Sequence, residues 1–258
     1  MITQPDPTHC SSLTISITDQ FRLLTSNPLE EYRCRSFFEK EPETVAWIES
    51  MIMNEDVMYD VGANVGVYSI YTAIQHPLAR VYAFEPLRGN FHRLCDNAQL
   101  NAVPNLIPLH FALSDRDGIQ PLYVSDYRTG ASGSQLGAAV NDLGEPFEPL
   151  GVEYVPSMRM DGMVKIFALP PPNHVKIDVD GLEARIIEGM RDLLSGNSVR
   201  SILIEVNNGV SDQRSISDCL KSFGFTSEHP LNRLPNHSRH RRQGTRSNLV
   251  ENVIFVRE

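Results

Sequence analysis

The sequence predicts an α/β protein whose central, mostly parallel sheet is covered by helices on both faces. Short apolar runs alternate with segments of helical spacing between residues 56 and 223, which is typical of repeated strand–helix units. The last two apolar runs have no helix between them, so these two strands must pair antiparallel. We therefore expect three layers, α/β/α, with an antiparallel last strand.

Each element has a local signal. The first helix should begin at Pro42, because proline suits the first helical turn and the acidic Glu43 favours the helix dipole. Further helices are expected, from apolar residues at helical spacing, over residues 68–74, 88–100, 182–194 and 215–223. Strands are expected, from short apolar runs, over residues 57–61, 80–84, 106–113, 174–179, 201–206, 225–227 and 252–256. The first six of these strands should run parallel to one another.

We divide the chain into an N-terminal extension, residues 1–41, and one α/β domain, residues 42–258. Two segments interrupt the strand–helix rhythm. Residues 125–157 contain five glycines where a crossover helix is expected, and a loop of this length is usually functional or mobile. Residues 229–248 contain five arginines and three histidines. We expect the two segments to form a lid over a substrate.

The composition indicates a soluble globular protein. Lys and Arg number 23 against 32 Asp and Glu, and the formal net charge of −9 argues against nucleic acid as the main partner. The four cysteines lie far apart with no CxxC pair, so zinc and redox motifs are absent and a reduced, cytoplasmic protein is expected. We see no signal peptide and no apolar run near the roughly 18 residues of a membrane span. A homodimer is the candidate oligomeric state.

The strongest chemical signal is residues 60–66, DVGANVG, directly after the first expected strand. Ligands bind at the carboxyl ends of parallel strands, where Gly62 permits close approach and Asn64 tolerates a left-handed backbone. The dinucleotide fingerprint GxGxxG fails twice, because Asn64 and Val67 stand at its second and third glycines. Asp60 would repel a pyrophosphate but suits an ammonium and a sulfonium, both of which S-adenosylmethionine (SAM) carries.

Several motifs together resemble the FkbM family of SAM-dependent methyltransferases. They are residues 60–66 (DVGANVG), 84–86 (FEP), 112–115 (ALSD), 158–161 (MRMD) and 175–183 (VKIDVDGLE). The resemblance covers residues 42–206 and departs from the family at Met160, where leucine is more usual, and at Asp180, where glutamate is usual. It implies a class I, Rossmann-like methyltransferase fold and O-methylation of sugars, glycans, glycolipids or polyketide-type natural products.

The resemblance also implies the cofactor contacts. Asp60, Gly62, Asn64 and Gly66 would surround the methionine part of SAM. Glu85, which follows the second strand, would accept hydrogen bonds from the ribose hydroxyls. The residues that would border the adenine are Ala112, Leu113, Ser114 and Asp115.

The acceptor hydroxyl must be aligned with the methyl group and must lose a proton. Alternation along the fourth expected α/β strand places Lys176, Asp178 and Asp180 on one face. Asp178 is the first candidate for a base or substrate anchor, although Lys176 or backbone N–H groups could instead satisfy it. Asp180 is a second catalytic candidate, and its alternative is a capping box with Glu183. Lys176 is also a candidate for substrate contact.

The fifth strand ends in further oxygen ligands. Glu205, the third catalytic candidate, and Asn207 should lie at the same edge of the sheet as Asp178. Such an all-oxygen set suits Mg²⁺ or Ca²⁺, with hydrogen bonding inside the loop as the alternative.

Loop residues supply the remaining substrate candidates. Tyr127 and Arg128 could stack on sugar rings, and Arg241 belongs to an arginine cluster that suits a phosphate, uronate or sulfate. A solvated basic loop is the alternative. We therefore expect a small-molecule or glycan acceptor, no nucleic-acid partner and no membrane span.

Three other functions remain open on the sequence. A metal-assisted O-methyltransferase of a small natural product shares every motif above. The two missing glycines argue against a nicotinamide-dependent oxidoreductase. A thermal-shift comparison would distinguish it from a methyltransferase, because NAD rather than SAM would raise its melting temperature. A nucleic-acid methyltransferase or RNA-binding module has only the basic segment 229–248 in its favour, against a net charge of −9.

Overall fold

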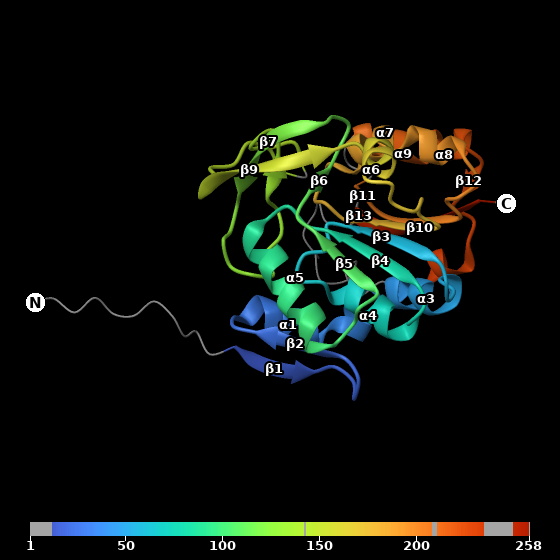
Figure 1. Cartoon of the computed structure of the whole chain (residues 1–258). Helices are drawn as coiled ribbons and strands as arrows, with labels where there is room; N and C mark the ends of the chain where they lie inside the picture. The colour runs from blue at the N-terminus through green and yellow to red at the C-terminus, as the bar shows by residue number, and fades with distance from the viewer. Residues whose placement is uncertain (1–11, 142, 208–210, 235–249, 258) are drawn as a thin grey trace, which may run out of the picture.

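The computed structural model describes residues 12–141, 143–207, 211–234 and 250–257. Over these residues, one large sheet of seven strands has the order β12-β13-β11-β10-β3-β4-β5 (Figure 1). Its strands are β3 (Val57–Val61), β4 (Arg80–Phe84), β5 (Leu106–Leu109), β10 (His174–Ile177), β11 (Ser201–Asn207), β12 (Phe225–Thr226) and β13 (Val250–Arg257). Strand β13 pairs antiparallel with both β11 and β12, and the other pairings are parallel. The expected mostly parallel sheet with an antiparallel last strand is confirmed.

Helices cover both faces of this sheet, as the apolar runs predict. The helices α3 (Pro42–Met51), α4 (Val67–Gln75) and α5 (Arg88–Leu100) pack on one face. The helices on the opposite face are α6 (Met160–Ile166), α7 (Glu183–Glu188), α8 (Arg191–Ser195) and α9 (Ser211–Ser222) (Figure 1). Each face buries its own cluster of side chains, so the three-layer α/β/α architecture rests on two apolar cores.

The segment before residue 42 packs into the lower of these two cores in Figure 1. It forms β1 (Leu13–Ser16), β2 (Arg22–Thr25), α1 (Pro28–Arg35) and α2 (Phe37–Lys40). Phe21 and Phe37 are buried, and their rings meet edge to face with centroids 5.3 Å apart. Phe37 also contacts Tyr71 of α4, with centroids 4.9 Å apart. The extension therefore shares its core with the residues that follow it.

The expectation of one strand over residues 106–113 is wrong. The chain turns after β5, where Phe111 N–H donates to the Leu109 carbonyl, and continues as β6. Residues 125–157 are also more regular than the expected loop, because they include strands at residues 135–136 and from residue 151 onward. A second, four-stranded sheet has the order β6-β9-β7-β8. Its strands are β6 (Ala112–Leu113), β7 (Gly118–Val124), β8 (Gln135–Leu136) and β9 (Gly151–Met158).

The single helix expected over residues 182–194 is divided at Gly189. A Cβ at this position would stand 2.0 Å from the Ser114 carbonyl oxygen, so the chain can pass there only as glycine. The second half, α8, is capped from outside the segment, since Asp161 accepts hydrogen bonds from Asp192 N–H at 2.9 Å and Leu193 N–H at 3.0 Å.

The expected capping box of Asp180 and Glu183 is likewise wrong. Helix α7 begins at Glu183 with Leu182 as its N-cap, and Asp180 lies outside it with a left-handed φ of +56°. Glu183 instead accepts hydrogen bonds from Gly181 N–H at 3.0 Å and Val179 N–H at 3.3 Å. Glu183 thus holds the turn before α7 in place.

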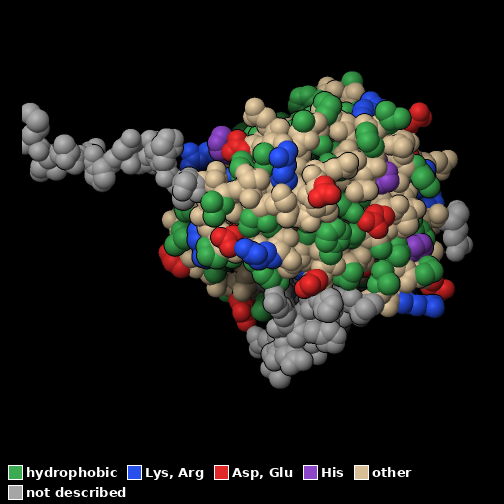
Figure 2. Space-filling view, turned by 90° about the horizontal axis from the view of Figure 1, so that it is seen from below, with side chains coloured by type: hydrophobic (Ala, Val, Ile, Leu, Met, Phe, Trp, Pro, Cys, Tyr) green, Lys and Arg blue, Asp and Glu red, His purple; other side chains and the backbone are tan. Residues whose placement is uncertain are grey.

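The remaining features concern the surface. On the face shown in Figure 2, the described acidic and basic side chains are scattered among apolar ones. Of the basic segment 229–248, the structure describes residues 229–234, which include the 3₁₀-helix η1 (Pro230–Arg233). In the described part of the chain, no helix combines the length and the apolar character that a membrane crossing requires. Cys34, Cys95 and Cys219 are free thiols.

Candidate active site

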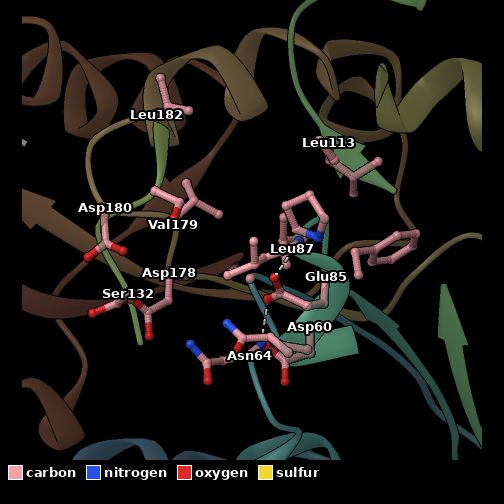
Figure 3. Close-up of a pocket in the computed structure, with 18 of the residues that line it drawn as sticks. Asp60, Asn64, Glu85, Leu87, Leu113, Ser132, Asp178, Val179, Asp180 and Leu182 are labelled. Carbon is pink, nitrogen blue, oxygen red and sulfur yellow. Dashed lines mark hydrogen bonds between the residues drawn. The ribbon is translucent and has the colours of Figure 1, made fainter. Parts of the chain in front are cut away.

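A cavity lies where β3, β4, β10 and β11 end, at the carboxyl edge of the large sheet (Figure 3). This is the edge at which parallel α/β sheets bind ligands. The sequence candidates that line the cavity are Asp60, Gly62, Asn64, Glu85, Ala112, Leu113, Lys176, Asp178, Asp180 and Glu205. Five separate segments of the chain therefore converge on one site.

The turn after β3 has the geometry that its glycine predicts. Gly62 has a φ of +83°, and a Cβ there would stand 2.0 Å from the Asp178 carbonyl oxygen. Asn64 is left-handed, with a φ of +53°, and its side-chain Nδ2 donates to the Ala131 carbonyl at 2.8 Å. Gly66, with a φ of +87°, is the N-cap of α4 and lies against Leu94 rather than in the cavity lining. Gly66 therefore contributes to the shape of the turn without lining the cavity.

Glu85 presents a buried carboxylate at the end of β4. One carboxylate oxygen accepts Asn64 N–H and the other accepts Leu87 N–H, each at 2.8 Å (Figure 3). A carboxylate offers about four lone-pair positions, so acceptor capacity remains for a pair of hydroxyls. Burial raises the pKa of Glu85 to about 7, although the two N–H groups favour the ionised form.

Lys176 joins two carboxylates at the floor of the cavity. Its Nζ is 3.0 Å from Asp178 Oδ2 and 3.7 Å from Asp60 Oδ1, and its side chain is only 2% exposed. Burial disfavours the ammonium, but Asp178 and Asp60 outweigh this effect and raise the pKa of Lys176. The predicted face shared by Lys176 and Asp178 is confirmed by this contact.

The pKa values of the two carboxylates shift in opposite directions. Burial opposes the ionised form of Asp178, but Lys176 and then Lys40 outweigh it and lower the pKa of Asp178 to about 2. Burial raises the pKa of Asp60, and Lys176 opposes the shift. Ser69 Oγ donates to Asp60 Oδ2 at 2.5 Å, whereas Asp60 Oδ1 has no hydrogen-bond partner among the described residues. Asp60 Oδ1 thus remains able to accept a hydrogen bond from a ligand.

Asp180 and Glu205 complete the acidic side of the cavity. Asp180 Oδ2 accepts Gly133 N–H at 2.7 Å, so this side chain turns toward the segment before β8 rather than toward Lys176. Burial, together with the charges of Asp178 and Asp180, raises the pKa of Glu205 well above its usual range. This shift favours the protonated acid, whose O–H is a hydrogen-bond donor.

The expected adenine border is only partly at the cavity. Ala112 and Leu113 line it, whereas Ser114 and Asp115 do not. Ser114 is buried and donates to Asp115 at 2.9 Å, and Asp115 in turn forms an ion pair with Arg185 at 2.8 Å.

The substrate candidates in the loops lie away from the cavity lining. Tyr127 is half exposed beside Gly151, and Arg128 is paired with Asp126 at 2.5 Å. Arg241 lies outside the described residues. What the segment 125–157 does bring to the cavity is a short stretch of small residues, residues 131–134, together with Leu136.

Among the described residues, sequence reasoning missed three titratable side chains of the cavity lining. Arg33 and Lys40 come from α1 and α2, in the segment assigned to an extension, and Tyr68 comes from the first turn of α4. Lys40 forms an ion pair with Glu41. No motif marks Arg33 or Lys40, and only the fold brings them to the sheet edge. Tyr68 comes shortly after the glycine turn, in the first turn of the helix, and this position could have indicated that it lies at the cavity.

The residues proposed for a metal do not form a metal site in the described structure. Asp178 is already paired with the Lys176 ammonium, which would repel a divalent cation, and the raised pKa of Glu205 disfavours the carboxylate form that a metal ion requires. The side chain of Asn207 lies outside the described residues. Within the described ranges, no group of three or more His, Cys, Asp or Glu side chains is placed to hold an ion.

The fold and the site define a SAM-dependent methyltransferase of the class I, Rossmann-like type. The family model described as the Methyltransferase FkbM domain matches residues 60–227. The chain belongs to the FkbM methyltransferase family. This assignment leaves the nicotinamide-dependent oxidoreductase without support.

Two relatives indicate the range of the family. The chain is 28% identical over 174 residues to the hexuronic acid methyltransferase AglP of Haloferax volcanii, which covers 67% of this chain and 65% of AglP. It is 26% identical over 197 residues to the 31-O-demethyl-FK506 methyltransferase FkbM of Streptomyces tacrolimicus, covering 66% of this chain and 73% of that protein. The chain thus spans slightly less than two thirds of the length of AglP.

Solved structures with a similar fold include other methyltransferases. Fibrillarin from Aeropyrum pernix, in complex with SAM, aligns with a TM-score of 0.46 and 12% identity, covering 84% of this chain and 74% of fibrillarin. A precorrin-6y C5,15-methyltransferase from Geobacter metallireducens GS-15 aligns with a TM-score of 0.46 and 15% identity, covering 84% of this chain and 87% of that one.

The cavity fits the chemistry of SAM. Asp60 Oδ1, which accepts no hydrogen bond in the described structure, suits an ammonium, and the free acceptor capacity of Glu85 suits a ribose diol. Ala112 and Leu113 offer an apolar border for a flat base. When bound, SAM supplies a methyl group on a sulfonium sulfur.

Proposed function

We propose that this protein transfers a methyl group from SAM to a hydroxyl of a sugar, a glycan or glycolipid, or a glycosylated natural product. AglP and FkbM, which act on a hexuronic acid and on a demethylated FK506, support this substrate range. The observation that carries the proposal is an ionised carboxylate, that of Asp178, at the end of β10 beside the cofactor residues.

Asp178 is the group we assign to the acceptor hydroxyl. A carboxylate that stays ionised accepts a hydrogen bond from the hydroxyl and so aligns its oxygen with the methyl group. As the carbon–oxygen bond forms, the hydroxyl oxygen becomes positive and its proton becomes strongly acidic. A carboxylate with a pKa of about 2 can then accept that proton. Lys176 fixes the position of this carboxylate through their 3.0 Å contact.

Glu205 and Asp180 would have positioning roles. The raised pKa of Glu205 favours its protonated form, which would donate a hydrogen bond and so suits an oxygen of the acceptor next to the reacting hydroxyl. Asp180 ties residues 131–134 to the turn after β10 through Gly133, so it would shape the acceptor side of the cavity. Lys176 would act on the acceptor only through Asp178, because it is buried beneath it.

Metal dependence stays a prediction, with Asp178, Glu205 and Asn207 as its residues. The ion pair of Asp178 with Lys176 favours a mechanism in which no divalent ion binds that carboxylate. The same assay that tests methyl transfer, run with and without EDTA, separates the two mechanisms.

The testing experiment is incubation of the protein with methyl-labelled SAM and a panel of acceptors. The panel contains uronic acid glycosides, matched neutral glycosides, a hydroxylated macrolide and total RNA. We expect label in a glycoside or macrolide ether, located by NMR, in the presence of EDTA. Label in RNA alone, or on a nitrogen or carbon atom of an acceptor, would refute the proposal.

A further inference from the structure

Among the described residues, three cationic side chains line the cavity, and two of them already have carboxylate partners. Lys40 is paired with Glu41, and Lys176 with Asp178 and Asp60. Arg33 differs, because within the described residues no carboxylate lies within ion-pair distance of its guanidinium. A partly buried cation that faces a ligand cavity without a counter-charge points to an anionic group of a ligand.

The position of Arg33 is set by a single hydrogen bond. Its Nε donates to the Gly130 carbonyl at 2.8 Å, which leaves the two terminal Nη groups for another acceptor. Helix α1 is further tied to this turn by Asn27, whose Nδ2 donates to the Thr129 carbonyl at 3.0 Å. The guanidinium is therefore held in place before any ligand arrives.

The turn that holds Arg33 also holds the glycine turn after β3. Asn64 Nδ2 donates to the Ala131 carbonyl at 2.8 Å, one residue beyond the Gly130 carbonyl that Arg33 binds. The charge of Arg33 also favours the ionised forms of both Glu85, where it opposes the larger effect of burial, and Asp178. Arg33 accordingly belongs to the end of the cavity that residues 60–66 form.

We propose that Arg33 binds the carboxylate of the methionine part of SAM. The planar guanidinium suits a carboxylate because its parallel N–H groups can donate two hydrogen bonds. Asp60 Oδ1, which accepts no hydrogen bond in the described structure and lies 3.7 Å from Lys176 Nζ, is the acceptor for the ammonium of the same amino acid group. The two ends of the zwitterion thus meet a hydrogen-bond donor from α1 and an acceptor from β3. The inference rests on the assignment of residues 60–66 to the methionine part and is independent of the acceptor.

The test compares ligands that differ in this carboxylate, measured by isothermal titration calorimetry. S-adenosylhomocysteine carries the whole amino acid group, decarboxylated SAM lacks the carboxylate, and 5′-methylthioadenosine lacks both carboxylate and ammonium. The variants are Arg33→Gln and, as matched control, Arg35→Gln. Arg35 lies on the same helix, is 71% exposed and is paired only loosely, at 4.0 Å, with Glu31.

Arg33→Gln should weaken S-adenosylhomocysteine binding by about 10- to 100-fold and change the affinity for the other two ligands by less than about 3-fold. Arg35→Gln should change none of the three. An equal loss for 5′-methylthioadenosine would overturn the proposal, because Arg33 would then act only by supporting the Gly130 turn. Unchanged S-adenosylhomocysteine affinity would also overturn it and would leave an acidic acceptor as the partner of Arg33. Failure of the unmutated protein to bind S-adenosylhomocysteine would instead remove the cofactor site itself.

Discussion

The charge state of Glu85 should control ribose binding across neutral pH. Its carboxylate must be ionised to accept hydrogen bonds from both ribose hydroxyls, yet burial raises its pKa to about 7. The affinity for the adenosyl part should therefore rise with pH through this region and level off above it. A protonated Glu85 has one acceptor oxygen fewer for the diol.

The size of the effect follows from the ionised fraction. If only the ionised form binds, the apparent Kd exceeds its limiting value about 11-fold at about pH 6, about 2-fold at about pH 7 and about 1.1-fold at about pH 8. We therefore expect roughly 10-fold weaker binding at about pH 6 than at about pH 8.

The assay is calorimetric titration with 5′-methylthioadenosine, which has the ribose but neither the ammonium nor the carboxylate of SAM. Glu85→Gln is the control, because its amide keeps the shape and does not titrate in this range. Its affinity should be weaker than that of the unmutated protein at about pH 8, by roughly 10-fold, and independent of pH. A flat profile for the unmutated protein, or the same slope in both proteins, would refute the reasoning.

Stability and activity provide three more tests. Gly62 and Gly224 both have a φ of +83°, but of these two positions only Gly62 would place an added Cβ 2.0 Å from a backbone oxygen. In urea denaturation, Gly62→Ala should therefore lower the free energy of unfolding by about 2 kcal/mol more than Gly224→Ala does. Equal losses would contradict the clash. Asp178→Asn should lower kcat by about 100-fold or more with SAM affinity within about 3-fold, and Asp126→Asn, on the exposed pair with Arg128, should change neither. Retained kcat in Asp178→Asn would exclude its role as proton acceptor. Burial lowers the pKa of His174 to about 4, so the free energy of unfolding should fall by up to about 3 kcal/mol as the pH falls from about 6.5 to 4. The His174→Asn variant should lose less of its free energy of unfolding over this pH range in acid denaturation. Identical pH dependence of the two proteins would show that His174 does not titrate in this range.

The sign of the last effect follows from where the proton binds. His174 is held neutral in the folded protein, where Ser201 Oγ lies 2.7 Å from Nδ1 and Asp56 Oδ2 lies 3.1 Å from Nε2. In the unfolded chain the imidazole gains a proton near pH 6.5. The unfolded state thus binds more protons between the two pKa values, and stability falls as the pH falls.

Most of the large sheet could be predicted because its signals are local. Apolar runs of four to seven residues marked β3, β4, β10 and β11, and the glycine turn after β3 marked the ligand edge. The same logic located Glu85, since a carboxylate at the end of the second strand lies at that edge in any such sheet.

The errors arise where one local sequence pattern is compatible with two different structures. Residues 106–113 are apolar except for His110, and nothing in that pattern shows that the chain turns at Phe111 and enters a second sheet. The spacing of Asp180 and Glu183 matches a capping box. The backbone of Asp180 is instead left-handed, and its side chain accepts a hydrogen bond from Gly133 N–H. Such contacts join residues far apart in the sequence, so no window of neighbours contains them.

The contribution of the first 41 residues to the cavity was beyond sequence reasoning. Arg33 and Lys40 lie on short helices with no chemical motif around them, and they reach the sheet edge only because Phe21 and Phe37 dock the segment against α4. The charge balance of the cavity, which decides the pKa of Asp178, depends in part on Lys40. The chemistry of the site is thus partly determined by packing far from its motifs.

A crystal structure of the protein grown with S-adenosylhomocysteine tests the central claim most directly. The account predicts the ribose hydroxyls within hydrogen-bond distance of both Glu85 oxygens, the adenine against Leu113 and the amino group beside Asp60. Density for the ligand at another edge of the sheet, or a cavity that takes up NAD in its place, would contradict it.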